Sequence, residues 1–180
     1  MNGEFRPGPR RERLRRAARG FTLVELMVTI IVLAILVGLA VPSFRDASLS
    51  SRLSAYANDL VASAQLARSE AIKRNAPVTL CASEDGATCE ADDTDWNVGW
   101  IVMTSDNAVL QRQEALPAEF RFTEAGGESE IVFPAAVVGV NPVSFTVCRA
   151  DPVGSQERIV TVTASGATSV TRTEDGDCPE

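Results

Sequence analysis

The sequence predicts an α+β chain in which a long N-terminal helix, membrane-spanning in its first half and amphipathic in its second half, packs on an antiparallel β-sheet domain. Three observations predict this class. Residues 21–41 are almost uncharged and apolar, apolar residues then recur at helical spacing to about residue 75, and an alternating pattern with turn residues follows Pro77. One long helix followed by successive strands is typical of the α+β class. The predicted segments are a basic leader (1–20), a transmembrane segment (21–42), an amphipathic continuation (43–76) and a β-rich domain (77–180).

The apolar run from Phe21 to Val41 has the length of a membrane-spanning helix. Its 21 residues include one charged side chain, Glu25, and at about 1.5 Å per residue a helix of this length covers about 30 Å. The run is longer than the core of a secretory signal, and no small-residue cleavage site follows it. Any cleavage is therefore expected before the run, which leaves the helix in the mature chain.

Charge is distributed unevenly along the chain. Residues 1–20 contain seven arginines against Glu4 and Glu12, a net charge of +5, whereas the remaining 160 residues carry a net charge of −12. A basic flank beside a membrane helix stays on the cytoplasmic side. We therefore expect a single-pass membrane protein with a cytoplasmic N-terminus and an acidic C-terminal domain outside the cytoplasm.

The cysteine and histidine content restricts the chemistry. The chain has no histidine and four cysteines, at Cys81, Cys89, Cys148 and Cys178. In an oxidising compartment four cysteines predict two disulfides, with three pairings to choose from, and four free thiols are the alternative. The absence of histidine excludes imidazole zinc sites and histidine-dependent nucleophiles. No phosphate loop, dinucleotide motif or nucleophile elbow occurs either, so we expect no catalytic residue, no metal and no cofactor.

Residues 43–75 read as a continuing amphipathic helix. Its apolar residues recur at spacings of three and four and form one stripe, made of Leu49, Leu53, Tyr56, Leu60, Ala64, Ala67 and Ala71. We expect this stripe to be buried against a sheet. The alternating pattern after Pro77 predicts strands at 78–82, 99–104, 108–113, 119–123, 130–133, 143–149, 158–164 and 169–172.

The start of the apolar run carries a specific motif. It reads Gly20-Phe21-Thr22-Leu23-Val24-Glu25-Leu26, and Pro42-Ser43-Phe44 follows the run. These residues resemble the N-terminus of type IV pilins and type II secretion pseudopilins. The resemblance implies a pilin-like fold, cleavage by a prepilin peptidase between Gly20 and Phe21, and N-methylation of Phe21. It also implies a structural subunit that leaves the bacterial inner membrane through an assembly platform and joins other subunits in a periplasmic pseudopilus or a type IV pilus.

Glu25 has two interpretations that are compatible with each other. By resemblance, it pairs with the Phe21 amine of a neighbouring subunit during assembly. From the residues alone, Thr22-x-x-Glu25 is a capping-box pattern that places a carboxylate at a helix N-terminus. Gly38 and Pro42 also leave two alternatives, either a kink at the end of the span or, by resemblance, a segment that loosens when subunits pack.

The body narrows the resemblance to one branch of this family. Cys81 and Cys89 followed by Trp96-Asn97-Val98-Gly99-Trp100, together with the late pair Cys148 and Cys178, are similar to minor pseudopilins and minor pilins of the GspH/FimT type. This resemblance implies disulfides between Cys81 and Cys89 and between Cys148 and Cys178. Trp96 and Trp100 are interpreted as core residues rather than as a ligand platform.

Two ligand-binding hypotheses remain to be weighed. Asp93-x-Asp95-x-Asn97 copies the start of a calcium loop, but Val98 and Thr104 break the pattern, which favours a solvated acidic loop. Some FimT-type minor pilins bind DNA for natural transformation through a basic Gly-Arg-x-Arg motif. The matching stretch here, from Gly166 to Arg172, has one arginine and an acidic tail after it, which disfavours contact with phosphates. DNA binding is kept as the alternative function.

Overall fold

The computed structural model describes residues 20–90, 95–136, 139–151, 154, 156–174 and 178. By its internal contacts the chain divides into two units, Met1–Ser43 and Phe44–Glu180. Residues 1–19, which form most of the predicted leader, lie outside the described residues. Among the described residues the structure contains one helix that is long and apolar enough to cross a membrane, by its length and composition.

That helix, α1, extends from Leu23 to Arg74. It passes through Gly38 and Pro42 without an interruption in the helical assignment, and a positively charged last turn with Asn75 in the left-handed region (φ 51°) ends it. In the first unit, every described side chain from residue 20 to residue 43 is exposed. In the second unit, one face of α1 is buried.

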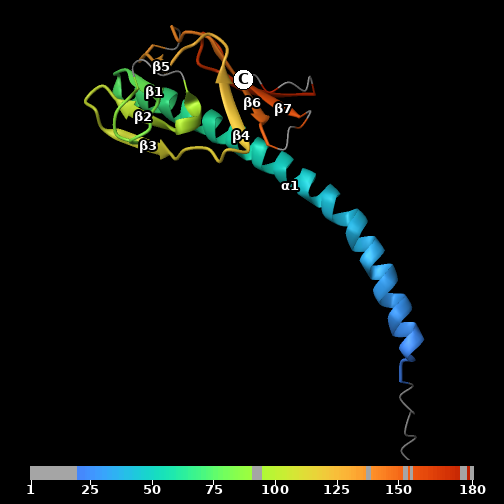
Figure 1. The fold of residues 1–180 in the computed structure, drawn as a ribbon. Coiled ribbons are helices and arrows are strands. Elements are labelled where there is room, and N and C mark those ends of the chain that lie inside the picture. The colour runs from blue at the N-terminus through green and yellow to red at the C-terminus, as the bar shows by residue number, and fades with distance from the viewer. Residues whose placement is uncertain are drawn as a thin grey trace, which may run out of the picture. The chain divides into compact units, whose positions relative to one another are not determined.

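Eight strands and one short 3₁₀ helix follow α1 (Figure 1). They are β1 (Val78–Ala82), η1 (Trp96–Val98), β2 (Trp100–Thr104), β3 (Val109–Gln113), β4 (Phe120–Glu124), β5 (Glu130–Phe133), β6 (Val143–Arg149), β7 (Glu157–Val162) and β8 (Thr168–Thr173). Each of the eight strands corresponds to a predicted strand, with ends that agree to within two residues, whereas η1 was not predicted. The expected α+β class with a long N-terminal helix and antiparallel pairing is therefore confirmed.

The strands form two four-stranded antiparallel sheets. Sheet A has the order β3-β2-β1-β5 and sheet B the order β4-β6-β7-β8. In Figure 1, β1, β2 and β3 lie close together beside α1. Strands β4, β6 and β7 form a second group in the yellow and orange part of the chain. The alternating pattern did not predict that the strands divide into two sheets.

The core of the second unit lies between α1 and the inner faces of both sheets. The buried helix residues are Leu53, Ala57, Leu60, Ala64, Ala67 and Ala71, with Leu49 and Tyr56 partly buried beside them. This agrees with the predicted stripe, to which the structure adds Ala57 and Ser63. Small alanines allow the strands to approach the helix closely, and the bulky strand residues fill the space between them.

The two tryptophans join the sheets through this core. Trp96 and Trp100 are fully buried, and their rings lie 4.8 Å from Phe145 and 5.4 Å from Phe122, both on sheet B. Each indole N–H is paired: Trp96 Nε1 donates to the Glu128 carbonyl and Trp100 Nε1 donates to Ser63 Oγ, both at 2.9 Å. The interpretation of both residues as core is confirmed.

Candidate functional site

The predicted processing and assembly residues lie at the start of α1 and directly before it. Gly20 and Phe21 precede the helix, and Phe21 is 82% exposed. Thr22 caps the helix, since its Oγ1 accepts a hydrogen bond from the Glu25 backbone N–H at 3.2 Å. A polar residue of this kind fixes where the helix begins, and Gly20 and Phe21 lie before it as exposed residues.

The Glu25 side chain behaves differently from the other polar groups of the span. Thr22 caps the helix, and Thr29 Oγ1 donates to the Leu26 carbonyl at 2.8 Å. The Glu25 carboxylate makes no hydrogen bond or ion pair with any described residue, so the return half of the capping box does not form. Within the described part of one chain, Glu25 therefore has no partner that would offset its cost in an apolar segment.

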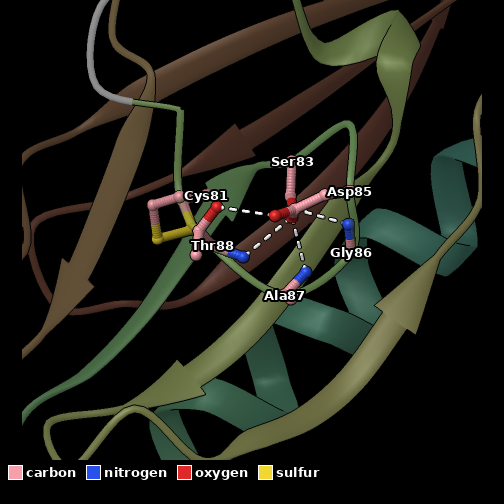
Figure 2. The surroundings of a disulfide bond; sticks show 7 residues. Cys81, Ser83, Asp85, Gly86, Ala87 and Thr88 are labelled. Carbon is pink, nitrogen blue, oxygen red and sulfur yellow. Dashed lines mark hydrogen bonds between the residues drawn. A yellow bond between two sulfur atoms is a disulfide. The ribbon is translucent and has the colours of Figure 1, made fainter.

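A disulfide joins Cys81, a fully buried residue of β1, to Cys89 eight residues later, with the two Cα atoms 5.5 Å apart. The loop between them is ordered by Asp85 (Figure 2). The Asp85 carboxylate accepts hydrogen bonds from the backbone N–H groups of Ala87 (2.7 Å) and Thr88 (2.8 Å), and from the hydroxyls of Thr88 and Ser83. These bonds, above all that from the Thr88 backbone, hold the pKa of Asp85 well below its usual range.

The second disulfide joins Cys148 on β6 to Cys178 near the C-terminus, again with Cα atoms 5.5 Å apart. Val143, Phe145 and Val147 of β6 point into the core, so Cys148 faces the opposite side of sheet B. The tail after β8 is thereby attached to a strand that is not its neighbour. Both pairs are those that the resemblance implied.

The candidate calcium residues have structural partners in the part of the chain that is described. Asp95 is the N-cap of η1, and its carboxylate accepts a hydrogen bond from the Asn97 N–H at 2.9 Å. Asn97 reaches sheet B, where its Oδ1 accepts from the Phe122 N–H at 2.7 Å and its Nδ2 donates to the Phe122 carbonyl. Asp93 lies outside the described residues. Among the residues described, no group of three or more ligand side chains is suited to a metal.

Gly99 directly follows η1, and its φ is 106°. A Cβ atom on Gly99 would lie 2.4 Å from the Gln113 carbonyl oxygen, which no side chain tolerates. The Trp-Asn-Val-Gly-Trp stretch is thus explained by packing and backbone geometry: two buried rings, one side-chain link between sheets and one obligatory glycine.

A polar contact region connects α1 to sheet B. Arg149 forms an ion pair with Asp46 at 3.1 Å, and Arg158 donates to Ser54 Oγ at 3.2 Å and Ser50 Oγ at 3.4 Å. Arg172, the remaining arginine of the compared DNA-binding stretch, forms an exposed ion pair with Glu174 at 2.9 Å.

Sequence reasoning missed the roles of Ser63, Asp85, Asn97 and Arg158, because each depends on a partner far away in the chain or on loop geometry.

Comparisons with known proteins agree with these features. Residues 56–166, more than half of the chain, match the family described as type II transport protein GspH. Residues 15–41 match the prokaryotic N-terminal methylation motif, which includes Gly20, Phe21 and Glu25.

The chain is similar to type II secretion system protein H of Pseudomonas aeruginosa, with 43% identity over 60 residues. That alignment spans 33% of this chain and 35% of the relative, about a third of each. Two crystal structures of the type IV minor pilin FimU of Pseudomonas aeruginosa share the fold, with TM-scores of 0.54 and 0.52 at 19% identity. They cover 69% and 66% of this chain and 91% of the FimU chains. The chain therefore belongs to the GspH family, a family of non-enzymatic minor pseudopilins of type II secretion.

Proposed function

We propose that this chain is a structural subunit of a periplasmic pseudopilus that serves type II protein secretion. It is made as an inner-membrane precursor with a basic leader (1–20), a membrane-spanning segment (21–42), an amphipathic helix (43–76) and a periplasmic domain (77–180). A prepilin peptidase removes the leader and methylates Phe21. The mature chain then passes through the inner-membrane assembly platform into the filament.

The observation that carries this proposal is the state of the first half of α1. Its large apolar side chains, from Leu23 to Val41, are all exposed in the isolated chain, and Leu33 and Leu36 are about three-fifths exposed. A helix apolar around its whole surface needs lipid or other helices around it. Lipid would cover this surface before processing, and the helices of neighbouring subunits would cover it in the filament.

Glu25 supports assembly through this helix. Glu25 follows Phe21 by four residues, and the Phe21 backbone nitrogen becomes a free amine if the leader is cleaved after Gly20. An amine and a carboxylate on neighbouring subunits neutralise each other, and such a pair offsets the cost of each charge in an apolar environment. The capping role of Thr22 is compatible with this, because Thr22 uses its own hydroxyl and leaves the carboxylate unengaged.

Processing is tested by mass spectrometry of the protein purified from membranes of its own host. The expected mature N-terminus is methylated Phe21. A mature chain that begins at Met1, or after Ala40, would contradict the proposed cleavage site.

Assembly is tested with Glu25→Ala and Glu25→Gln, using Thr29→Ala as the matched control within the span. We expect both Glu25 variants to be cleaved normally and to be lost from the filament, while Thr29→Ala is incorporated. The readouts are the mass of the cleaved chain, the amount of the chain in sheared filaments and secretion of the system's substrates. Normal secretion in a strain that lacks the gene would count against the proposal as a whole.

A further inference from the structure

Strand β8 forms one edge of sheet B. It pairs with β7 over its whole length, from Glu157↔Thr173 to Val162↔Thr168, and no described strand pairs with its other side. Its residues from Ser169 to Arg172 are exposed, and Val170 is 38% exposed. An edge of this kind offers unpaired backbone groups to an added strand.

Two arginines face each other beside this edge. Arg158 on β7 is directly opposite Arg172 on β8. Residues directly opposite in an antiparallel pair have neighbouring side chains on one face, and like charges in that position destabilise the pair. Burial, together with the charge of Arg172, holds the pKa of Arg158 below its ordinary value.

Neither arginine is neutralised by a buried carboxylate in the described part of the chain. Arg158 is only 7% exposed, and its acceptors are the neutral Ser54 and Ser50 hydroxyls and the Glu157 carbonyl. Among the described residues Arg172 pairs only with Glu174, and both side chains are more than half exposed, so this pair contributes little. A buried cation without an anion is costly. Among the described residues no carboxylate offsets that cost, and an added carboxylate would lower it.

The flank of α1 continues this surface toward the other end of β8. Gln65 Nε2 donates to Thr168 Oγ1 at 3.2 Å, and beyond this bond lies a cavity of about 530 Å³ between the helix and the turn that precedes β8. Arg68 lines the cavity and forms no ion pair with a described residue. The surface therefore has an arginine at each end and an exposed valine between them.

We propose that β8 and the adjoining flank of α1 bind an extended acidic segment of a neighbouring pseudopilin subunit. The segment adds to sheet B as a strand beside β8 and places a carboxylate against Arg172, in front of Arg158. Two residues along, on the same face, an apolar side chain contacts Val170. This inference rests on the proposed function, since it assigns one surface of the chain to subunit contact in the filament.

Charge favours a protein segment over nucleic acid as the occupant. The chain after the leader carries a net charge of −12, and Glu174 stands beside Arg172. Binding to nucleic acid depends on several cations along a backbone of phosphates. Binding of a single carboxylate, in contrast, requires only the two neighbouring arginines, Arg158 and Arg172.

Photo-crosslinking in the host tests the surface. A benzophenone amino acid is placed at Val170 and, as a matched control, at Val109, which is 37% exposed on the edge strand β3 of sheet A. We expect position 170 to crosslink to another pseudopilin subunit through a peptide with an acidic residue. The yield should exceed that at position 109 by about tenfold. Equal yields at the two positions would overturn the inference.

Charge reversal tests the role of the arginine pair. Arg172→Glu is expected to lower incorporation into the filament about tenfold, as for the loss of a close charge pair across an interface, and a Glu→Lys or Asp→Lys change in the crosslinked peptide should restore it. Arg52→Glu, the same change at an exposed helix position, is the control and should be incorporated normally. Arg172→Gln should be incorporated poorly while its unfolding temperature in detergent equals or exceeds that of the wild type, a combination that misfolding cannot produce.

Three results would refute the inference while leaving the proposed function intact. One is normal incorporation of Arg172→Glu in a strain where the wild-type chain is incorporated. Another is Arg172-dependent binding of a DNA duplex by the full-length chain in detergent at physiological salt, which would assign the arginines to nucleic acid. The third is a large loss of unfolding temperature in Asp175→Asn/Asp177→Asn, because the tail would then supply the missing anions.

Discussion

The two units of this chain treat apolar side chains in opposite ways. From residue 20 to residue 43 every described side chain is exposed, whereas from Phe44 onward the helix and both sheets share a core. Leucine illustrates the contrast on a single helix: Leu33 is 60% exposed and Leu60 is fully buried. The more apolar half of α1 is the half without partners. Hydrophobicity therefore shows that a surface must be covered, and only the rest of the chain shows whether the chain can cover it alone.

The largest expected effect compares these two leucines. Leu60→Ala removes a fully buried side chain and should lower the free energy of unfolding by about 2–5 kcal/mol. Leu33→Ala changes an exposed position of the other unit and should lower it by less than about 0.5 kcal/mol. Tryptophan fluorescence of the full-length chain in detergent during chemical unfolding reports the second unit, which contains Trp96 and Trp100. Equal losses in the two variants would remove the distinction between the units.

Removal of the disulfides should give the next largest effect, again confined to the second unit. The bridges close segments of 30 and 8 residues. On the chain-entropy account, Cys148→Ala/Cys178→Ala should therefore cost about 3.5 kcal/mol and Cys81→Ala/Cys89→Ala about 2.5 kcal/mol. Cleavage after Gly20 should be unchanged in both double variants, as judged by the mass of the chain. Loss of cleavage would show that processing depends on the folded outer domain.

Much of this division was predictable from the sequence because it follows from local patterns. The apolar run, the helical stripe and the strands all have periodic signals that do not depend on distant residues. The helix start was also predictable, because Thr22 lies within one turn of its partner. The continuity of the helix through Pro42 also depends on neighbouring residues, although the sequence did not decide between a kink and a segment that loosens.

The rest depends on partners that are far apart in the chain. Ser63 looks like a polar interruption of the stripe until β2 brings the Trp100 indole to it, 37 residues later. The opposition of Arg158 and Arg172 is a matter of strand register, which shifts with the length of one turn. The division of eight strands into two sheets depends similarly on which strands meet after the chain has collapsed. Local patterns carry none of this information.

A smaller effect tests whether the helix face and sheet A form one core. Trp100→Phe removes the donor to Ser63 Oγ and part of a buried ring, and should cost about 1–3 kcal/mol. Ser63→Ala removes the other member of the pair. Because the two residues are in contact, the double variant should cost less than the two single losses together, by about 0.5–3 kcal/mol. Strictly additive losses would mean that the hydrogen bond adds nothing to the packing.

The smallest expected effect depends on pH. The pKa of Asp85 is lowered in the folded chain, so its contribution to stability is present above the unfolded pKa of about 3.9 and is lost as the pH falls below it. Asp85→Ala should therefore unfold at a lower temperature than the wild type at pH 7, and this difference should shrink below about pH 4. Glu84→Ala, at the exposed neighbouring position, is the control. A difference that is independent of pH would show that the loop needs the side chain but not its charge.

The contact of Asn97 with Phe122 has a consequence for the chemistry allowed at that position. Its amide gives one donor and one acceptor to a single backbone unit, in the way that a residue of a neighbouring strand would. Aspartate has the same shape but would set an acceptor against the Phe122 carbonyl, and glutamine is one methylene longer. Position 97 is therefore as selective for asparagine as a binding site is for its ligand, because the side chain must match the donor and the acceptor of the Phe122 backbone.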